Sequence, residues 1–181
     1  PNQPVFIEAR PRIAASLSAG SPGAALDRAS LKARLDGRPA EGLVFDNAST
    51  VSFTPQAPLS NGTHEFCLDV RNAAGNAAQK ACSTFTVAVP PARMSVQPVF
   101  AVIPPDAEAA APVDIEVFDR LGRPVADNTQ VELETSAGRF AAAVVETKNG
   151  RARAFVISDK NPQQATITAR AGGISARCTL T

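Results

Sequence analysis

The stretch HEFCLDVRNAAGNAAQKAC, residues 64–82, carries one cysteine near its start and another at its end, with Gly75 and Asn76 between them. Glycine and asparagine favour tight turns because they tolerate a positive φ. Apolar and polar residues alternate before this turn, which is typical of a strand with one buried face. The stretch therefore predicts a β-hairpin, and its two cysteines raise the question of a stapled turn, a metal clamp or a binding loop.

The register of the hairpin follows if its turn is centred between residues 74 and 75. Cys67 then lies opposite Cys82, and Asp69 lies opposite Lys80. The apolar residues of both strands face the core in this register: Phe66, Leu68, Val70, Phe85, Val87 and Val89. Opposite residues of an antiparallel pair come close enough for a disulfide. We therefore predict a disulfide between Cys67 and Cys82 on the outer face; the alternative is a pair of reduced, half-exposed thiols.

Metal binding and nucleophilic catalysis have little support in the sequence. The only histidine, His64, falls on the apolar face of the hairpin, and no further Cys or His pair accompanies it, so zinc is not expected. Cys178 shares a strand face with Ile174, Ala176 and Leu180, which predicts a buried free thiol. Four aspartates are expected to be turn and surface residues: Asp36, Asp69, Asp119 and Asp127.

The composition disfavours several classes of function. The 181 residues include 18 basic and 17 acidic ones without blocks of one sign, so a nucleic-acid partner is not expected. All nine aromatic residues are phenylalanine, which disfavours a sugar platform built on Trp or Tyr. No apolar run reaches about 18 residues, so we expect no membrane insertion by this segment. No phosphate loop, zinc motif or nucleophile elbow occurs, so we predict neither an enzyme nor a cofactor.

Turn signals divide the chain into short strands. Fifteen prolines and eleven glycines are spread along it, which leaves few windows for a helix. Alternating segments recur about every 8 to 12 residues, as in a β-sandwich. They are residues 4–8, 12–18, 29–35, 49–53, 64–71, 80–89, 99–103, 112–118, 129–135, 139–147, 151–157, 164–170 and 174–180. Asp36 and Gly37 have the residue types of a tight hairpin turn.

A joint between two domains is expected at VAVPPARMSVQP, residues 87–98, because a proline pair ends the alternation there. We therefore predict an all-β chain with two β-sandwich domains, residues 1–89 and 90–181; one continuous barrel is the alternative. Residues 21–37 also fit a short helix that starts at a Ser-Pro pair. The alternation in SLKARL favours a strand there, preceded by a turn. The first residues lack a signal pattern, so any signal or anchor is expected elsewhere.

Two parts of the chain resemble known families. Residues 25–87, with RLDG, PLSNGTH, the Ala-Gly-Asn hairpin and the final FTV strand, resemble bacterial Ig-like domains. Residues 96–181, with DRLGRPV and TSAGRF, resemble Ig-like domains of the invasin and intimin type. The resemblance implies two Ig-like β-sandwiches in tandem. It also implies work as a spacer or stalk in a surface or secreted protein.

The loop of the stapled hairpin departs from this family pattern. Relatives of the first domain commonly carry Asp just before the Ala-Gly-Asn turn, and in some adhesin arrays such acidic positions help bind calcium between domains. This chain has Asn72 there, beside Arg71. Because Ca²⁺ prefers several anionic oxygen ligands, we expect no metal site. Asn72, Gly75 and Asn76 are the candidate loop-tip contacts for a partner.

These features together predict a non-catalytic structural or adhesion module, a spacer or stalk of a larger secreted or cell-surface bacterial protein. Its expected partners are other domains of the same polypeptide and a protein or glycan at the cell surface. A disulfide persists in oxidising compartments, so an extracytoplasmic location is expected, secreted, at the cell surface or in the periplasm. Two alternatives stay open: an accessory glycan- or protein-binding module of an extracellular hydrolase, and a subunit or decoration domain of an extracellular filament that uses exposed strand edges.

Overall fold

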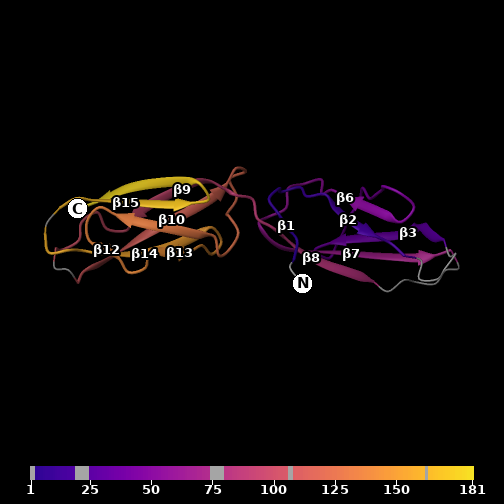
Figure 1. Cartoon of the computed structure of the whole chain (residues 1–181), viewed down its shortest axis with the longest axis horizontal. Coiled ribbons are helices and arrows are strands. Elements are labelled where there is room, and N and C mark those ends of the chain that lie inside the picture. The colour runs from indigo at the N-terminus through magenta and orange to yellow at the C-terminus, as the bar shows by residue number, and fades with distance from the viewer. Residues whose placement is uncertain (1–2, 19–24, 74–79, 106–107, 162) are drawn as a thin grey trace. The chain divides into compact units, whose positions relative to one another are not determined.

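The structure is a computed structural model that describes residues 3–18, 25–73, 80–105, 108–161 and 163–181. All regular elements of the described residues are β-strands, so the all-β class predicted from the sequence is confirmed. No helix among them is long and apolar enough to cross a membrane. The chain separates into two compact units, Pro1–Ala88 (unit 1) and Val89–Thr181 (unit 2), each of which is a sandwich of two sheets (Figure 1).

Unit 1 has one sheet with the strand order β1-β8-β7-β3-β4 and a smaller sheet with the order β2-β6-β5. The strands are β1 (Val5–Phe6), β2 (Ile13–Ser16), β3 (Leu26–Leu35), β4 (Arg38–Pro39), β5 (Val44–Phe45), β6 (Thr50–Phe53), β7 (Gly62–Asn72) and β8 (Ala81–Val87). Phe53 from the smaller sheet stacks on Phe66 from the larger one, with 5.4 Å between ring centroids. This buried aromatic pair joins the two sheets of the unit.

Unit 2 has the sheet orders β12-β14-β10-β9 and β13-β11-β15-β16. Its strands are β9 (Pro91–Pro98), β10 (Ala110–Asp119), β11 (Gln130–Thr135), β12 (Arg139–Phe140), β13 (Val144–Glu146), β14 (Arg151–Ile157), β15 (Ala165–Ala171) and β16 (Ile174–Leu180). Every second residue of β10 is buried, as expected for a strand with one face on the core. Val113, Ile115 and Val117 belong to one continuous apolar cluster with Val131 and Ile167 from the other sheet. Unit 2 therefore has a core of its own.

The boundary between the two units, after Ala88, lies within residues 87–98, the stretch expected to be the joint. Most of this stretch is a strand that the sequence did not predict, β9, which pairs with β10. Pro91 and Pro98 stand at the two ends of this edge strand, where a missing N–H breaks few ladder bonds. Residues 99–103, predicted as a strand, form no regular element. Their backbone instead bonds to the last residue of the chain, as described below.

The segment that also fitted a helix is a strand over its described part. Leu26–Leu35 form β3, and Ala33 within it is buried while its neighbours in the chain are not. The tight turn predicted after this strand is confirmed, since Asp36 has a φ of 50° and Gly37 a φ of 77°. Two consecutive positive φ angles are the requirement of a type I′ hairpin turn. The turn leads into β4. This strand has only two residues, which are too few to show an alternation in the sequence.

The first segment of unit 1 runs parallel to its last strand. Val5 and Phe6 of β1 pair in parallel with Thr86 and Val87 of β8. The N–H of Thr86 donates to the Pro4 carbonyl at 2.8 Å. The N–H of residue 88 donates to the Phe6 carbonyl at the same distance. Main-chain bonds therefore join the two ends of unit 1.

Unit 2 also has a parallel pairing, between its last residue and the segment that follows its first strand, β9. The N–H of Thr181 donates to the Ala101 carbonyl, and the carbonyl of Thr181 accepts from the Ile103 N–H, both at 2.9 Å. In a parallel pair of strands, one residue bonds through its N–H and its C=O to the two residues that flank the residue opposite it. The segment before β10 and the segment after β16 are thus joined in parallel, as β1 and β8 are in unit 1.

Candidate functional site

The stapled hairpin is present as the sequence predicts. Cys67 and Cys82 form a disulfide with 4.1 Å between their Cα atoms. Strands β7 and β8 pair in the predicted register, with these two residues opposite each other. All six residues predicted for the core side of the hairpin are buried: Phe66, Leu68, Val70, Phe85, Val87 and Val89. The disulfide and the register are therefore confirmed.

Two details of the hairpin differ from the prediction. Cys82 is exposed, but Cys67 is buried although it lies on the outer face. The ladder between β7 and β8 ends with residues 68 and 81, so it does not include the predicted pair of Asp69 and Lys80. Asp69 instead lies opposite Lys32 of β3.

One group of potential metal ligands occurs in the part of the chain that the structure describes. Glu65, Cys67 and Cys82 offer ligand atoms that lie within 4.8 Å of one another. The Glu65 Oε2 atom is 3.4 Å from the Cys67 sulfur. Zinc binds thiolates, and both sulfurs are bonded to each other here. The group is therefore a staple with a carboxylate beside it while the disulfide is intact.

His64 is buried and joins the turn after β3 to the start of β7. Its Nδ1 lies 2.7 Å from Asp36 Oδ2, and its Nε2 lies 2.9 Å from the Ser60 carbonyl. The ring nitrogens thus link the Asp36 carboxylate to the Ser60 carbonyl. Asp36 also accepts the Glu65 N–H through Oδ1. Burial raises the pKa of Asp36, but the hydrogen bonds from His64 and the Glu65 N–H outweigh it, and the net pKa lies below the ordinary value.

Asp119 is not the surface residue that the sequence suggested, because it is 2% exposed. Its Oδ1 accepts the N–H groups of Leu121 and Arg123, at 2.8 and 3.0 Å. Its Oδ2 accepts Nε and Nη2 of the Arg123 guanidinium, at 3.0 and 2.7 Å. The prediction failed because the turn that follows β10 folds back over the carboxylate. Asp119 and Arg123 therefore hold this turn together.

Cys178 is a free cysteine on β16, opposite Ile167 of β15. It is half-buried, where the sequence predicted a buried thiol, and it packs against the core of unit 2 from the edge strand. Burial raises the pKa of its thiol, which disfavours the nucleophilic thiolate form. The predicted alternation of this strand is present, with Ser175 and Arg177 exposed.

Of the three candidate loop-tip contacts, the structure describes only Asn72. Asn72 is half-buried at the end of β7, opposite Leu26 of β3. Gly75 and Asn76 lie outside the described residues. Contact of a partner with these three residues stays a prediction.

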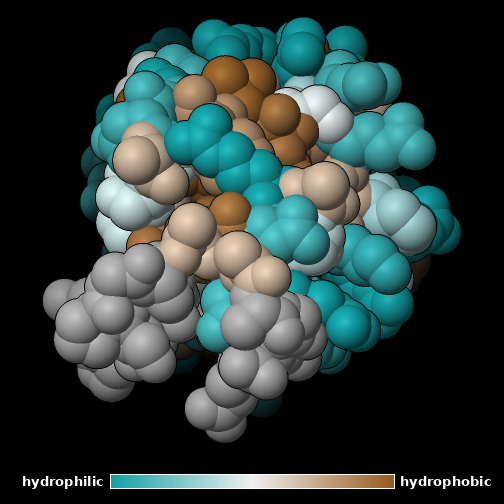
Figure 2. Space-filling view, turned by 90° about the vertical axis from the view of Figure 1, so that its right-hand side faces the viewer, coloured by the Kyte–Doolittle hydropathy of each residue, from teal (hydrophilic) through white to brown (hydrophobic). Residues whose placement is uncertain are grey.

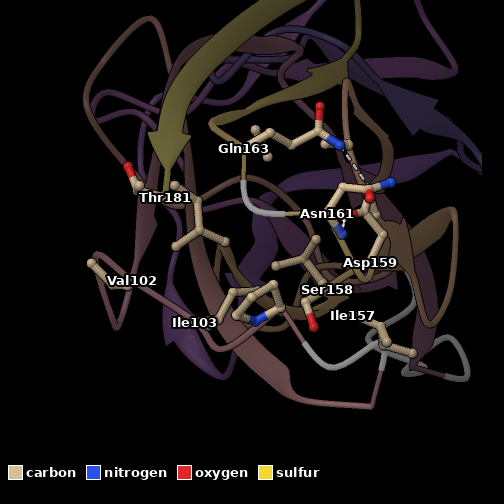
Figure 3. A pocket seen from close by; sticks show the side chains of 14 residues that line it. Val102, Ile103, Ile157, Ser158, Asp159, Asn161, Gln163 and Thr181 are labelled. Carbon is tan, nitrogen blue, oxygen red and sulfur yellow. Dashed lines mark hydrogen bonds between the residues drawn. The ribbon is translucent and has the colours of Figure 1, made fainter.

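A small cavity of about 170 Å³ opens in unit 2 where β14 and β16 end. Apolar residues such as Ile103 and Ile157 form most of its wall. Figure 3 shows Asp159, Asn161 and Gln163 on one side of it. Among them Asp159 accepts the Asn161 N–H and the Gln163 amide, both at 2.9 Å. The polar groups are thus bonded to one another, and the cavity has room for about one ring-sized apolar group.

The surface is mixed in character. Figure 2 shows, on the side it presents, a patch of apolar residues with hydrophilic residues around it. The large apolar side chains exposed in unit 1 are Val5, Ile7 and Val44, and those in unit 2 are Val99, Phe100, Val102, Leu121, Val144 and Phe155. Single exposed apolar residues are ordinary in folded proteins. A functional surface therefore needs a second feature, such as an open backbone edge.

Comparisons with known proteins identify the fold. No protein-family model matches the chain, and no curated protein matches its sequence. Among solved structures, the adhesin InvE of Yersinia pseudotuberculosis is 17% identical, with a TM-score of 0.52; the match covers 97% of this chain and 55% of that one. The D0-D1 domains of intimin are 13% identical, with a TM-score of 0.45 and coverage of 98% and 93%.

A glycosyl hydrolase family 2 member from Bacteroides cellulosilyticus DSM 14838 is 16% identical, with a TM-score of 0.44; the match covers 83% of this chain and 22% of that one. The chain thus spans about half of the adhesin and about a fifth of the hydrolase. At these identities the likeness concerns the fold alone. In fold, the chain is a tandem of two Ig-like β-sandwich units similar to those of the InvE adhesin.

Proposed function

We propose that the chain is a non-catalytic spacer of a larger protein outside the cytoplasm, and that it carries tension along the polypeptide. The observation that supports this is a parallel pairing in each unit: the last strand of unit 1 pairs with its first segment, and the last residue of unit 2 pairs with the segment that follows β9. When the two ends of such a unit are pulled apart, the paired segments slide along each other. All hydrogen bonds between them are then loaded together, whereas an antiparallel hairpin pulled at its open end loses its bonds one by one.

Other features of the units fit the same work. The Cys67–Cys82 disulfide is a covalent link that force cannot open by unfolding. Ionisable side chains hold turns in both units: the buried His64 bonds to Asp36 in unit 1, and the buried Asp119 bonds to Arg123 in unit 2. The disulfide also suits an oxidising compartment, which supports a secreted, surface or periplasmic location. Adhesion through a loop tip or through neighbouring domains of the same polypeptide is part of this proposal.

The proposal predicts that each main-chain bond between the paired end segments of unit 1 contributes to its lifetime under force. Ala88→Pro removes the N–H that donates to the Phe6 carbonyl. Loss of a hydrogen bond worth about 1 kcal/mol lowers the barrier to unfolding by that amount, which shortens the lifetime of unit 1 roughly fivefold. Magnetic tweezers that hold the chain by its two ends measure this lifetime directly. Ala88→Gly keeps the N–H and is the matched control.

Unit 2 in the same molecule is an internal reference for this measurement. The two units can be told apart because the disulfide keeps the residues between Cys67 and Cys82 from extending, so that unit 1 releases less chain until a reductant is added. We expect Ala88→Pro to shorten the lifetime of unit 1 alone. An unchanged lifetime of unit 1 in Ala88→Pro would contradict the proposal that the paired end segments carry tension.

A further inference from the structure

The two halves of the Cys67–Cys82 disulfide differ in their access to solvent. Cys67 is 4% exposed, whereas Cys82 is an exposed residue of β8. Reduction of a disulfide by a thiol begins when a thiolate attacks one of the two sulfurs, and its rate depends on which sulfur can be reached. A thiol in solution therefore attacks the Cys82 sulfur, and the Cys67 sulfur is the leaving group.

The Glu65 carboxylate lies beside this leaving group. Glu65 precedes Cys67 by two residues on β7, so their side chains share the outer face of the sheet. The Glu65 Oε2 atom is 3.4 Å from the Cys67 sulfur, and the carboxylate lies within 4.8 Å of both sulfurs. The sulfur carries no proton while it is bonded to Cys82. The contact therefore places a negative charge against the sulfur instead of forming an S–H hydrogen bond.

We propose that Glu65 slows the reduction of this staple by thiols. When a thiolate bonds to the Cys82 sulfur, the bond between the two cysteines breaks and its electron pair stays on the Cys67 sulfur. The new thiolate is buried and lies beside a carboxylate, and both conditions disfavour its negative charge. Since a poorer leaving thiolate departs more slowly, the attack proceeds more slowly.

A dithiol such as dithiothreitol completes the reaction. Its second thiolate attacks the mixed disulfide and releases the Cys82 thiolate, and the dithiol closes to a cyclic disulfide. Two electrons thus pass from the dithiol to the cysteines. The proposal needs only the staple of unit 1, so it stands or falls independently of the spacer function.

The rate of reduction in the folded full chain tests the proposal. With dithiothreitol at neutral pH, alkylation of the released thiols and intact mass give the time course. Glu65→Gln is expected to be reduced about fivefold faster than the wild type. Asp69→Asn is the matched control, because it removes the same charge from an exposed residue of the same strand, two residues beyond Cys67. Equal rates in Glu65→Gln and the wild type would overturn the proposal, as would an equal acceleration in Asp69→Asn.

A second arm separates the charge of Glu65 from a structural role in the sheet. Arg34 of β3 is exposed and lies opposite Cys67, where a cation favours the thiolate. Arg34→Gln disturbs the same face but is expected not to accelerate reduction. Added salt should narrow the difference between the wild type and Glu65→Gln, because ions screen exposed charges. Faster reduction of Arg34→Gln, or a difference that salt leaves unchanged, would show that Glu65 acts by holding the sheet together and would contradict the proposal.

The site of attack is mapped with the monothiol glutathione. Excess N-ethylmaleimide in denaturant blocks the free thiol and traps the mixed disulfide. Trypsin cleaves after Arg71 and Lys80, so the two cysteines fall in different peptides that mass spectrometry distinguishes. We expect glutathione on Cys82 and the maleimide on Cys67. Glutathione mainly on Cys67 would overturn the assignment of the leaving group and the proposal with it.

Discussion

Asp119→Ala is expected to destabilise unit 2 by about 3 kcal/mol, because it leaves a partly buried arginine and two backbone N–H groups without their acceptor. The Asp119 side chain is fully buried, and the Arg123 side chain is 23% exposed. Asp119 accepts four hydrogen bonds from Leu121 and Arg123, so no single neighbour can replace it. The loss should appear in unit 2 and leave unit 1 unchanged.

The chain has no Trp and no Tyr, so intrinsic fluorescence cannot follow this change. Urea unfolding followed by circular dichroism gives the free energy, and hydrogen exchange with mass spectrometry assigns it to a unit. Asp127→Ala is the matched control, because Asp127 is an exposed aspartate in a turn that accepts the Asn149 N–H. We expect a loss of about 1 kcal/mol or less for this control. Equal losses of unfolding free energy in Asp119→Ala and Asp127→Ala would mean that the buried ion pair stabilises the fold no more than an exposed hydrogen bond does.

The same substitution should change how unit 2 responds to acid. Burial raises the pKa of Asp119, but the bonds from Arg123 and the backbone outweigh it, so its net pKa in the folded state lies below the ordinary value of 3.8. A carboxylate with a lowered pKa stabilises the fold fully at neutral pH, and this contribution disappears as the pH falls from about 4 through the folded-state pKa. The stability of unit 2 in Asp119→Ala should therefore depend less on pH in that range than the wild-type value does.

Cys82→Ala is expected to destabilise unit 1 by about 3 kcal/mol, the value that the chain-entropy model gives for a closed loop of this length. The two cysteines are 15 residues apart in sequence. Cys82 is the better residue to replace, because it is exposed and its loss removes the staple without a cavity. Cys67 is buried, and its replacement would also remove packing in the sheet.

Thermal unfolding with and without a reductant measures the same effect in the wild type. We expect reductant to lower the melting temperature of unit 1 and to leave that of unit 2 in place. In Cys82→Ala the reductant should have no further effect. A wild-type unit 1 whose stability does not depend on the reductant would show that the disulfide is dispensable.

Some of this structure follows from the sequence, and the reasons are local. The hairpin of β7 and β8 has a turn, an alternation and two opposite cysteines that agree on one register, and the structure has that register. The turn at Asp36 and Gly37 follows from residue type alone, since few residues accept two positive φ angles in succession.

Other features depend on contacts that a sequence pattern does not contain. Asp119 reads as a surface residue because burial of a carboxylate depends on a turn that wraps around it. Strand β9 was not predicted within residues 87–98, because prolines at the ends of an edge strand resemble the end of an alternation. The exposure of Ala81 and Ser83 was not predictable, because both alternate along β8 with the same spacing as the buried Phe85 and Val87.

The proposal that the chain carries tension as a spacer is tested most directly by changing the direction of pulling. The full chain is held by its two ends in one experiment, and through Gln164→Cys and the C-terminus in the other. The first geometry loads, through β9, the parallel bonds of Thr181 with Ala101 and Ile103 in shear, and the second peels β15 from β16 bond by bond. The account predicts a longer lifetime of unit 2 at the same force when the chain is pulled by its ends. An equal or shorter lifetime in that geometry would contradict it.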